Sequence, residues 1–329
     1  MATIKDVAKR AGVSVATVSR VLNKKGPLSD DAIARVMSAV RELKYSPNLL
    51  ARSLASGRSN TIGVILPSFK TPIWSEMAQT IENCAKELGY RVIFSVESAD
   101  ARNRFSAVEY LRNLQVGGII FCGSMWGDKV LREKLKQVRD LPLALLLDQV
   151  EDLSCIVSDD AQGGLLAARH LIEKGCRSIV HVSSDLSIYK HSDERSYAFE
   201  RECFKHGVKY KRYENHSAMP GIEETAELLD QILEEVPDVD GMFLKNDILA
   251  MGCAMNMMVR KRRVPEDIKI IGYDDMFFSK AVYPPLTTIR HDYRMLASTA
   301  IHIILQQIEG KNVPNLTVVP VSLVERSST

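Results

Sequence analysis

Residues suited to contacting DNA lie near the start of the chain, in Val15-Ala-Thr-Val-Ser-Arg20. Small side chains let a helix approach the edges of bases in a major groove, and the forked guanidinium of Arg20 can bind guanine or phosphate. Ser14 can cap this helix, while Val18 and Val21 point inward. The spacing predicts a DNA-reading helix, although two short helices also pack around a glycine turn in proteins that never meet DNA.

The residues before this segment predict a first helix and the turn that joins the two. Thr3 can cap the first helix, and Asp6 lies in its positive first turn. Gly12 can end it, because glycine enters the left-handed region without strain. Apolar residues recur at helical spacing: Ile4, Val7, Ala8 and Ala11. Together these features predict a helix-turn-helix.

A third helix completes a small headpiece. Ser29 can cap it, and Asp30 and Asp31 complement its N-terminal dipole. The expected buried stripe is Ile33, Val36, Met37, Val40 and Leu43. Residues 1–60 hold eleven Lys and Arg against four Asp and Glu, whereas the chain as a whole carries a net charge of only +2. A basic end next to an acidic remainder is typical of a protein that binds DNA with that end.

Length and composition favour a soluble, cytoplasmic protein of two or three folding units. The 329 residues contain no run of 18 apolar residues and no basic-then-apolar leader. The six cysteines lie apart, each in or beside an apolar stretch, which indicates reduced, buried thiols rather than disulfides or zinc ligands. The seven histidines form no pair at ligand spacing, so no metal or cofactor is expected.

From Thr61 the pattern changes to apolar strands that alternate with helices, and a second such cycle starts near Gly163. The expected strands are 61–66, 90–96, 118–121, 143–147, 155–157, 178–182, 241–244 and 268–272. The expected helices are 73–88, 102–114, 129–138, 164–173, 194–206, 222–235 and 248–262. This alternation predicts two α/β subdomains with doubly wound parallel sheets. Because ligands bind beyond the carboxyl ends of such strands, we expect one site between the two subdomains.

The run Ile4-Lys-Asp-Val-Ala-x-x-Ala-Gly-Val-Ser-x-x-Thr-Val-Ser-Arg-Val-Leu-Asn23 resembles the headpiece of the lactose-repressor/galactose-repressor family of bacterial transcription regulators. The rest is similar, less densely, to the periplasmic sugar-binding fold that these repressors carry, with crossovers near 160 and 290 and a return near 320. The resemblance implies four parts. They are a helix-turn-helix headpiece at 1–46, a hinge helix or linker at 47–60, an N-subdomain at 61–160 and 291–320, and a C-subdomain at 161–290 and 321–329.

In the family the hinge helix pairs with that of a second subunit in the minor groove and wedges a leucine between base pairs. Leu54 occupies that position, and Arg52 can meet phosphate. Without the headpiece, the same segment would be interpreted as an ordinary linker helix. The expected DNA-binding residues are Thr3, Ser14, Val15, Ala16, Thr17, Ser19, Arg20, Asn23, Lys24, Arg52 and Leu54.

Polar residues that follow the strands resemble the family's effector site. Ile73 and Trp74 stand where the family usually has two aromatic residues, a departure that leaves one aromatic platform for a sugar or a purine. Arg195, Asn246 and Asp274 match positions at which the family binds its ligand. The full expected set is Ser68, Ile73, Trp74, Asp148, Asp159, Arg195, His216, Lys245, Asn246, Asp274 and Tyr293.

Several of these residues have a plainer interpretation. Acids such as Asp159 and Asp247 often cap the helix that follows a strand. Lys245 indicates either an anionic effector, such as a sugar phosphate, or a side chain in solvent. A lone His216 is more often a surface residue.

Enzyme functions are not supported. The sequence lacks Gly-x-Gly-x-x-Gly, a Walker-type loop, His-Glu-x-x-His and Gly-x-Ser-x-Gly. We expect a repressor that binds a near-palindromic operator and responds to a sugar or sugar phosphate. A homodimer is expected because the C-terminus lacks leucine heptads. The alternatives are a purine-dependent corepressor system, an activator, or a sugar-binding protein without a DNA role.

Overall fold

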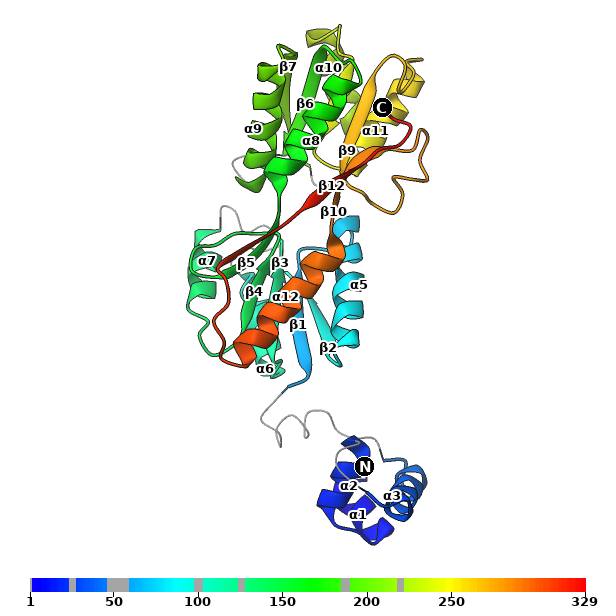
Figure 1. Cartoon of the computed structure of the whole chain (residues 1–329), viewed down its shortest axis with the longest axis vertical. Coiled ribbons are helices and arrows are strands. Elements are labelled where there is room, and N and C mark those ends of the chain that lie inside the picture. Colours follow the sequence, from blue (N-terminus) through cyan, green and yellow to red (C-terminus); the bar gives the residue numbers. More distant parts are fainter. Residues whose placement is uncertain are drawn as a thin grey trace. The chain divides into compact units, whose positions relative to one another are not determined.

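The computed structural model divides the chain into two compact units, Met1–Ser59 and Asn60–Thr329, which are called the headpiece and the core below (Figure 1). The residues that it describes are 2–23, 28–45, 59–97, 103–123, 128–184, 190–217 and 222–329. The expected hinge helix at 48–57 lies outside these ranges.

The described part of the headpiece contains the expected helices, α1 (Ile4–Ala11), α2 (Val15–Asn23) and α3 (Asp30–Glu42). Thr3 and Asp6 form a capping box at the start of α1, in which each side chain accepts from the backbone N–H of the other residue. Gly12 follows α1 at a φ of 64°, the left-handed conformation for which glycine was expected. Ser29 caps α3 by accepting from the backbone N–H of Ala32.

The headpiece core is small and rich in alanine. Its buried residues are Val7, Ala8, Ala11, Val18, Val21, Val36 and Ala39. The predicted stripe of α3 is partly wrong, because Ile33 and Met37 are 38% and 39% exposed. Ala32 and Ala39 are buried with Val36 instead. Because these side chains are short, the face of α3 that carries them packs closely on α1 and α2. Ile33 and Met37 lie beside this face and are therefore partly exposed.

In its described part, the core has two six-stranded sheets. Sheet A has the order β11-β5-β4-β3-β1-β2, and sheet B has the order β12-β10-β9-β8-β6-β7. Sheet A consists of β1 (Thr61–Leu66), β2 (Arg91–Val96), β3 (Gly118–Cys122), β4 (Leu143–Leu146), β5 (Ser154–Ser158) and β11 (Leu316–Val319). Sheet B consists of β6 (Ser178–Ser184), β7 (Lys209–Asn215), β8 (Gly241–Leu244), β9 (Lys269–Asp274), β10 (Thr287–His291) and β12 (Val321–Val324). Neighbouring strands are parallel except β10 and β12.

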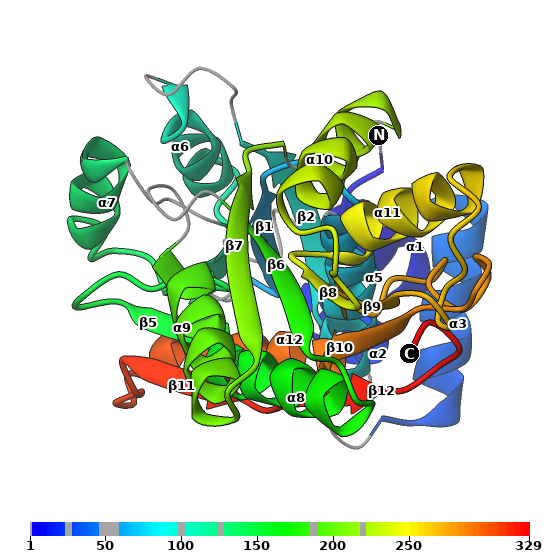
Figure 2. The ribbon, with the colours of Figure 1, turned by 90° about the horizontal axis from the view of Figure 1, so that it is seen from above.

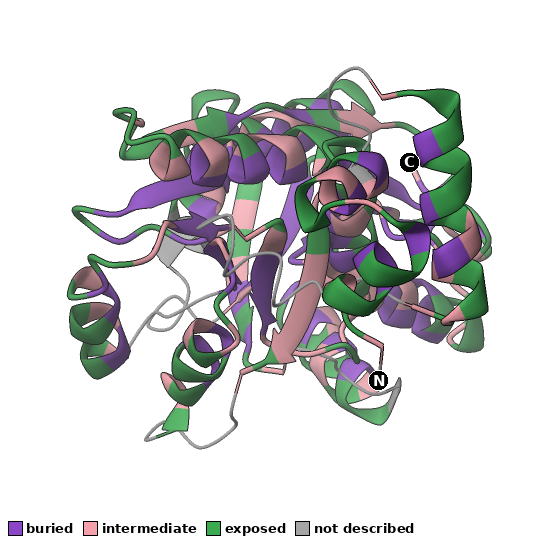
Figure 3. Ribbon diagram, turned by 90° about the horizontal axis from the view of Figure 1, so that it is seen from below, coloured by how far each residue is buried: buried purple, intermediate pink, exposed green. Residues whose placement is uncertain are grey.

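Helices cover both faces of each sheet, as strands buried on both sides require (Figures 2 and 3). One face of sheet A packs on α5 and α12, and the other packs on α6 and α7. Sheet B lies between α10 and α11 on one face and α8 and α9 on the other. Their bounds are α5 (Pro72–Glu87), α6 (Ser106–Asn113), α7 (Lys129–Lys136), α8 (Asp160–Glu173), α9 (Lys190–Lys205), α10 (Ile222–Glu235), α11 (Asp247–Val259) and α12 (Tyr293–Ile308). The predicted doubly wound α/β class is confirmed.

The described chain crosses between the sheets in three places, after β5, after β10 and between β11 and β12. Five elements lie outside the predicted set: β7, β10, α12, β11 and β12. The strand β7 was not predicted because it contains no apolar run: it is an edge strand, Lys-Tyr-Lys-Arg-Tyr-Glu-Asn, rich in charged residues.

All six cysteines are buried free thiols, as predicted. Burial raises the pKa of Cys155 to about 11, which keeps this thiol protonated near neutral pH. None of the described helices combines the length and apolar character needed to cross a membrane.

Close packing of α8 on α9 depends on Gly164. A Cβ placed there would lie 2.0 Å from the backbone oxygen of Arg195 on α9, closer than atoms can approach. A backbone atom cannot move aside as the tip of a side chain can, so the two helices would have to separate.

We therefore expect Gly164→Ala to lower the free energy of unfolding by about 1–3 kcal/mol, the usual cost of overpacking. Urea denaturation of this variant beside Gln162→Ala, an exposed position of the same helix, provides the measurement. Alanine favours a helix over glycine by about 1 kcal/mol, so a stabilised Gly164→Ala would contradict the packing argument.

Candidate functional site

The first candidate site is the outer face of α2 in the headpiece. Val15, Ala16 and Arg20 are exposed, whereas Val18 and Val21 are buried. The helix therefore presents the side chains predicted to face DNA. Ser14 Oγ accepts from the backbone N–H of Thr17 at 3.1 Å, so it caps α2 as expected. Exposure of this face is a precondition for groove binding.

The other predicted DNA-binding residues are less accessible or lie outside the described part. Thr17 and Ser19 are half-buried, and the Thr17 hydroxyl shares a hydrogen bond of 2.9 Å with Ser14. Thr3 is exposed and engaged in the capping box of α1. Lys24, Arg52, Leu54 and the side chain of Asn23 fall outside the described residues. Their contacts with DNA remain predictions.

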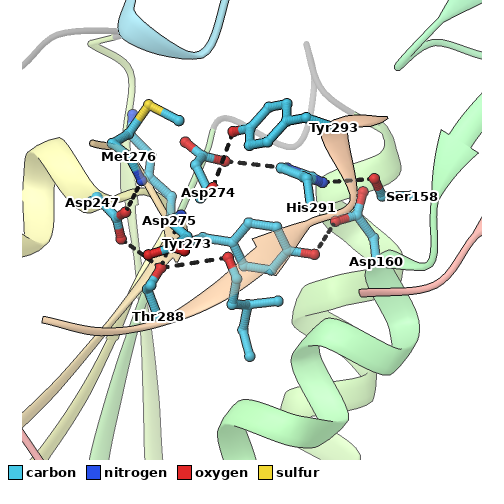
Figure 4. A network of polar contacts seen from close by, with 12 residues as sticks. Ser158, Asp160, Asp247, Tyr273, Asp274, Asp275, Met276, Thr288, His291 and Tyr293 are labelled. Carbon is cyan, nitrogen blue, oxygen red and sulfur yellow. Dashed lines mark hydrogen bonds and ion pairs between the residues drawn. The ribbon is translucent and has the colours of Figure 1, made fainter. Parts of the chain in front are cut away.

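The second candidate site is a polar network at the carboxyl ends of the sheet B strands (Figure 4). Asp274 ends β9 with a φ of 103°, and Asp275 follows at 54°. Two successive residues other than glycine in the left-handed region store backbone strain, which is often found at binding sites. Tyr293, the first residue of α12, holds this turn by donating its hydroxyl to the Asp274 carbonyl at 3.0 Å. His291 Nε2 lies 3.2 Å from the carboxylate of Asp274.

Arg195 forms a largely buried ion pair with Asp160. Its Nε and Nη2 both donate to Asp160 Oδ1, at 3.0 and 2.5 Å, and its Nη1 donates to the carbonyl of Lys245 at 3.0 Å. The guanidinium also lies 3.2 Å above the ring of Tyr273, whose hydroxyl donates to the same Asp160 oxygen. Burial alone would raise the pKa of Asp160, but the neighbouring Arg195 charge and hydrogen bonds hold it below its ordinary value.

Three polar residues at strand ends serve as helix caps or loop anchors. Asp159 caps α8 by accepting from the Gln162 N–H at 2.8 Å, and Asn246 caps α11 by accepting from the Leu249 N–H at 3.0 Å. Asp247 is fully buried, and its carboxylate accepts from Met276, Ser279 and Thr288 of the β9–β10 region. Capping is the plainer interpretation of Asp159, and Asp247 anchors the segment after β9. Effector contacts of Asp159 and Asn246 remain predictions.

Lys245 does not point freely into solvent. It is buried, and its ammonium donates to the backbone carbonyls of Asn215 and Ser217, both at 2.6 Å. Burial lowers the pKa of Lys245 to about 8. The lysine thus anchors the segment after β7, in which His216 is exposed.

The predicted residues of sheet A lie at two places. Trp74, in the first turn of α5, packs half-buried on the same apolar core as Tyr293. Ser68 accepts from the Lys70 N–H in the loop before α5. Asp148, after β4, is fully buried and accepts from the Gln149 N–H at 2.7 Å. Ile73, beside Trp74, is half-buried.

The structure adds Ser158, Asp160, Tyr273 and His291 to the residues expected from sequence. Ser158 Oγ lies 2.6 Å from His291 Nδ1, which gives a Ser-His-Asp arrangement with Asp274. The serine is only 5% exposed, so a substrate could not reach it as a nucleophile would require. The sequence signal for these residues is weak, because an acid beside Asp159 and a histidine before Asp292 have no distinctive spacing. Among the described residues, no three His, Cys, Asp or Glu side chains group as metal ligands.

Comparisons with known proteins give a consistent result. Residues 3–48 match the model "Bacterial regulatory proteins, lacI family", and residues 168–329 match the "Periplasmic binding protein-like domain". The ribose operon repressor of Halalkalibacterium halodurans is 32% identical over 333 residues, covering 100% of this chain and 97% of that protein. The repressor PurR of Erwinia tasmaniensis is also 32% identical, with the same coverage. A Lac repressor dimer bound to operator and the anti-inducer ONPF superposes with a TM-score of 0.85 at 30% identity, covering 99% of this chain and 98% of that one.

The match to whole-length relatives extends over headpiece and core together, so it is not limited to the DNA-binding motif. The structural similarity to the Lac repressor likewise covers 99% of this chain, so it includes the helix-turn-helix and both doubly wound sheets. On these grounds, the chain belongs to the lacI family of bacterial regulatory proteins.

Proposed function

We propose that this protein is a homodimeric transcription repressor that binds a near-palindromic operator and releases it when a small sugar binds to the core. The observation that carries the proposal is the exposed face of α2, formed by Val15, Ala16 and Arg20, on a basic headpiece of this family. Because a repressor acts on bacterial DNA, we assign the protein to the cytoplasm. The protein is a regulator and not an enzyme.

The sugar site lies around Asp274, Arg195 and Tyr293, with Trp74 and Asp148 on the side of sheet A. Carboxylates and a guanidinium suit the hydroxyl groups of a sugar, because each can form two hydrogen bonds. Since Lys245 already donates to two carbonyls, we favour a neutral sugar over a sugar phosphate. The named relatives include a ribose operon repressor, which makes D-ribose the first sugar to test.

The sugar controls operator binding because the sugar site and the DNA-binding site are thermodynamically linked. A sugar that binds one arrangement of the core more tightly shifts the population toward it, and the segment between core and headpiece transmits the shift to the DNA-binding units. The relatives named PurR keep the purine-dependent corepressor as an alternative. The sign of the response separates the two mechanisms.

The test is operator binding with and without effector. Selection from random-sequence duplexes supplies the operator, and fluorescence anisotropy measures its Kd in the presence of D-ribose, ribose 5-phosphate or hypoxanthine. D-Ribose is expected to weaken operator binding by about 5- to 150-fold, the usual range of such coupling. Tighter binding with hypoxanthine would establish the corepressor alternative. If the selection enriches no duplex sequence, the proposed sequence-specific DNA binding is refuted.

Arg20 is expected to read bases, whereas Lys24 is expected to contact phosphate. Arg20→Ala should therefore reduce discrimination between the operator and a mismatched duplex, by about 1–3 kcal/mol at one base pair. Lys24→Ala should weaken binding to all duplexes alike and reduce the slope of log K against log salt by about 1. Binding isotherms on both duplexes at several salt concentrations provide the comparison. Unchanged discrimination in Arg20→Ala would show that α2 does not read the groove through this residue.

The surface that we assign to the dimer lies on α11 and the loop between β9 and β10. The inner face of α11 is buried, yet Met255, Met258 and Val259 on its outer face are 43%, 48% and 79% exposed. Phe277 and Tyr283 of the loop are also exposed, at 68% and 77%. A helix that is apolar on both faces is usually covered on both. A second copy of the chain would cover this patch and match the two-fold symmetry of a palindromic operator.

Met255→Glu is expected to convert the dimer into monomers, because the new carboxylate would be buried without a partner. Val130→Glu is the matched control, since Val130 is 67% exposed on α7, outside this patch. Sedimentation equilibrium of wild type and both variants at micromolar concentration gives the masses. If Met255→Glu stays dimeric, or Val130→Glu becomes monomeric, the assigned surface is wrong.

A further inference from the structure

The three crossings between the sheets lie together, and one hydrogen bond links two of them. Ser158 is the last residue of β5, and His291 is the last residue of β10. Ser158 pairs with Val319 of β11, and His291 pairs with Val321 of β12, the two strands on either side of the third crossing. The bond of 2.6 Å between Ser158 Oγ and His291 Nδ1 joins the first two crossings directly. Backbone pairing of β5 with β11 and of β10 with β12 then joins these two crossings to the third crossing.

The other nitrogen of the His291 ring faces the predicted effector contact. Nε2 lies 3.2 Å from Asp274 Oδ1, and His291 and Asp274 are largely buried (Figure 4). The two ring nitrogens of His291 thus contact Ser158 on one side and Asp274 on the other, which makes one chain of contacts from Ser158 to Asp274.

We propose that His291 is a positioning residue, which orients the Asp274 carboxylate for the effector and links its occupancy to the crossings between the sheets. The inference rests on the proposed function, because it takes Asp274 as an effector contact. A sugar hydroxyl that donates to Asp274 shares the charge of this carboxylate with His291 and so weakens the contact of Nε2. The ring then shifts, and its contact with Ser158 shifts with it. Residues at the ends of secondary-structure elements commonly act as hinges, and Ser158 and His291 both occupy such positions.

Ser154 provides a matched control for Ser158. It is the first residue of the same strand, it is 6% exposed against 5% for Ser158, and its Oγ accepts from Gln307 Nε2 at 3.1 Å. Ser154→Ala and Ser158→Ala each remove one buried hydroxyl from β5. Only Ser158→Ala breaks the contact with His291.

The first experiment measures D-ribose affinity by titration calorimetry and its effect on operator affinity by anisotropy. Ser158→Ala is expected to keep the D-ribose Kd within about twofold of wild type, because Asp274 retains its own partners. The change in operator affinity caused by D-ribose should fall by about fivefold or more. His291→Gln should show the same fall in coupling, since its amide can replace Nε2 but not Nδ1, and Ser154→Ala should behave as wild type. Wild-type coupling in Ser158→Ala would overturn the proposal.

The second experiment needs no effector. Hydrogen–deuterium exchange of the free protein compares the crossings in the two serine variants, including the Asp159 amide that donates to the Val319 carbonyl at 2.8 Å. Ser158→Ala is expected to speed exchange there by about threefold or more relative to Ser154→Ala, because the contact that joins the crossings is gone. Equal rates would overturn the proposal even in a sugar-controlled protein. If no sugar binds the wild type, the effector part of the proposed function fails, and the exchange rates alone decide the role of His291.

Discussion

The buried ion pair between Asp160 and Arg195 is the interaction on which the arrangement of sheet B depends. It joins the start of α8 to α9, and the same arginine binds the carbonyl of Lys245 after β8 and stacks on Tyr273 of β9. A charge left unpaired at such depth costs several kcal/mol, so these elements must meet in this geometry. Gly164 belongs to the same constraint, because it lets α8 lie against the backbone of Arg195.

This constraint affects what Arg195 can do for a ligand. Its contacts with Asp160 and Lys245 occupy part of its donor set, and the stacking on Tyr273 fixes the plane of the guanidinium. A guanidinium held in this way is preorganised, and the entropy of ordering it is lost during folding rather than on binding. The strained turn at Asp274 is also fixed within the protein, because Tyr293 and His291 both contact Asp274.

The headpiece is stabilised in a different way. Its core consists largely of alanine and valine, and its helices owe their ends to local caps at Thr3, Ser14 and Ser29. A thin core of this kind stabilises little, so the caps at the helix ends matter more to this small unit. Residue type and helical spacing were enough to predict that Arg20 and the small residues Val15 and Ala16 are exposed.

The contacts of the candidate effector residues were less predictable from sequence. Positions after strands were expected to gather at one edge, and Asp274 and Tyr293 do so through a direct hydrogen bond. The sequence could not distinguish an acid that caps a helix, such as Asp159, from one that completes an ion pair, such as Asp160. The two are neighbours of the same type, and only their partners differ. For Lys245, the deciding contacts are carbonyls that lie 28 and 30 residues away.

The sequence by itself determined the helix-turn-helix, the alternation of strands and helices, and the family, because caps, periodicity and motif spacing act over a few residues. Tertiary structure alone decided that Ile33 and Met37 face outward, that Lys245 is anchored, and that Ser158, His291 and Asp274 form one chain of contacts. Ser158 and His291 are 133 residues apart. They meet because the crossing after β5 lies beside the crossing after β10, a consequence of how whole sheets pack that no local pattern encodes.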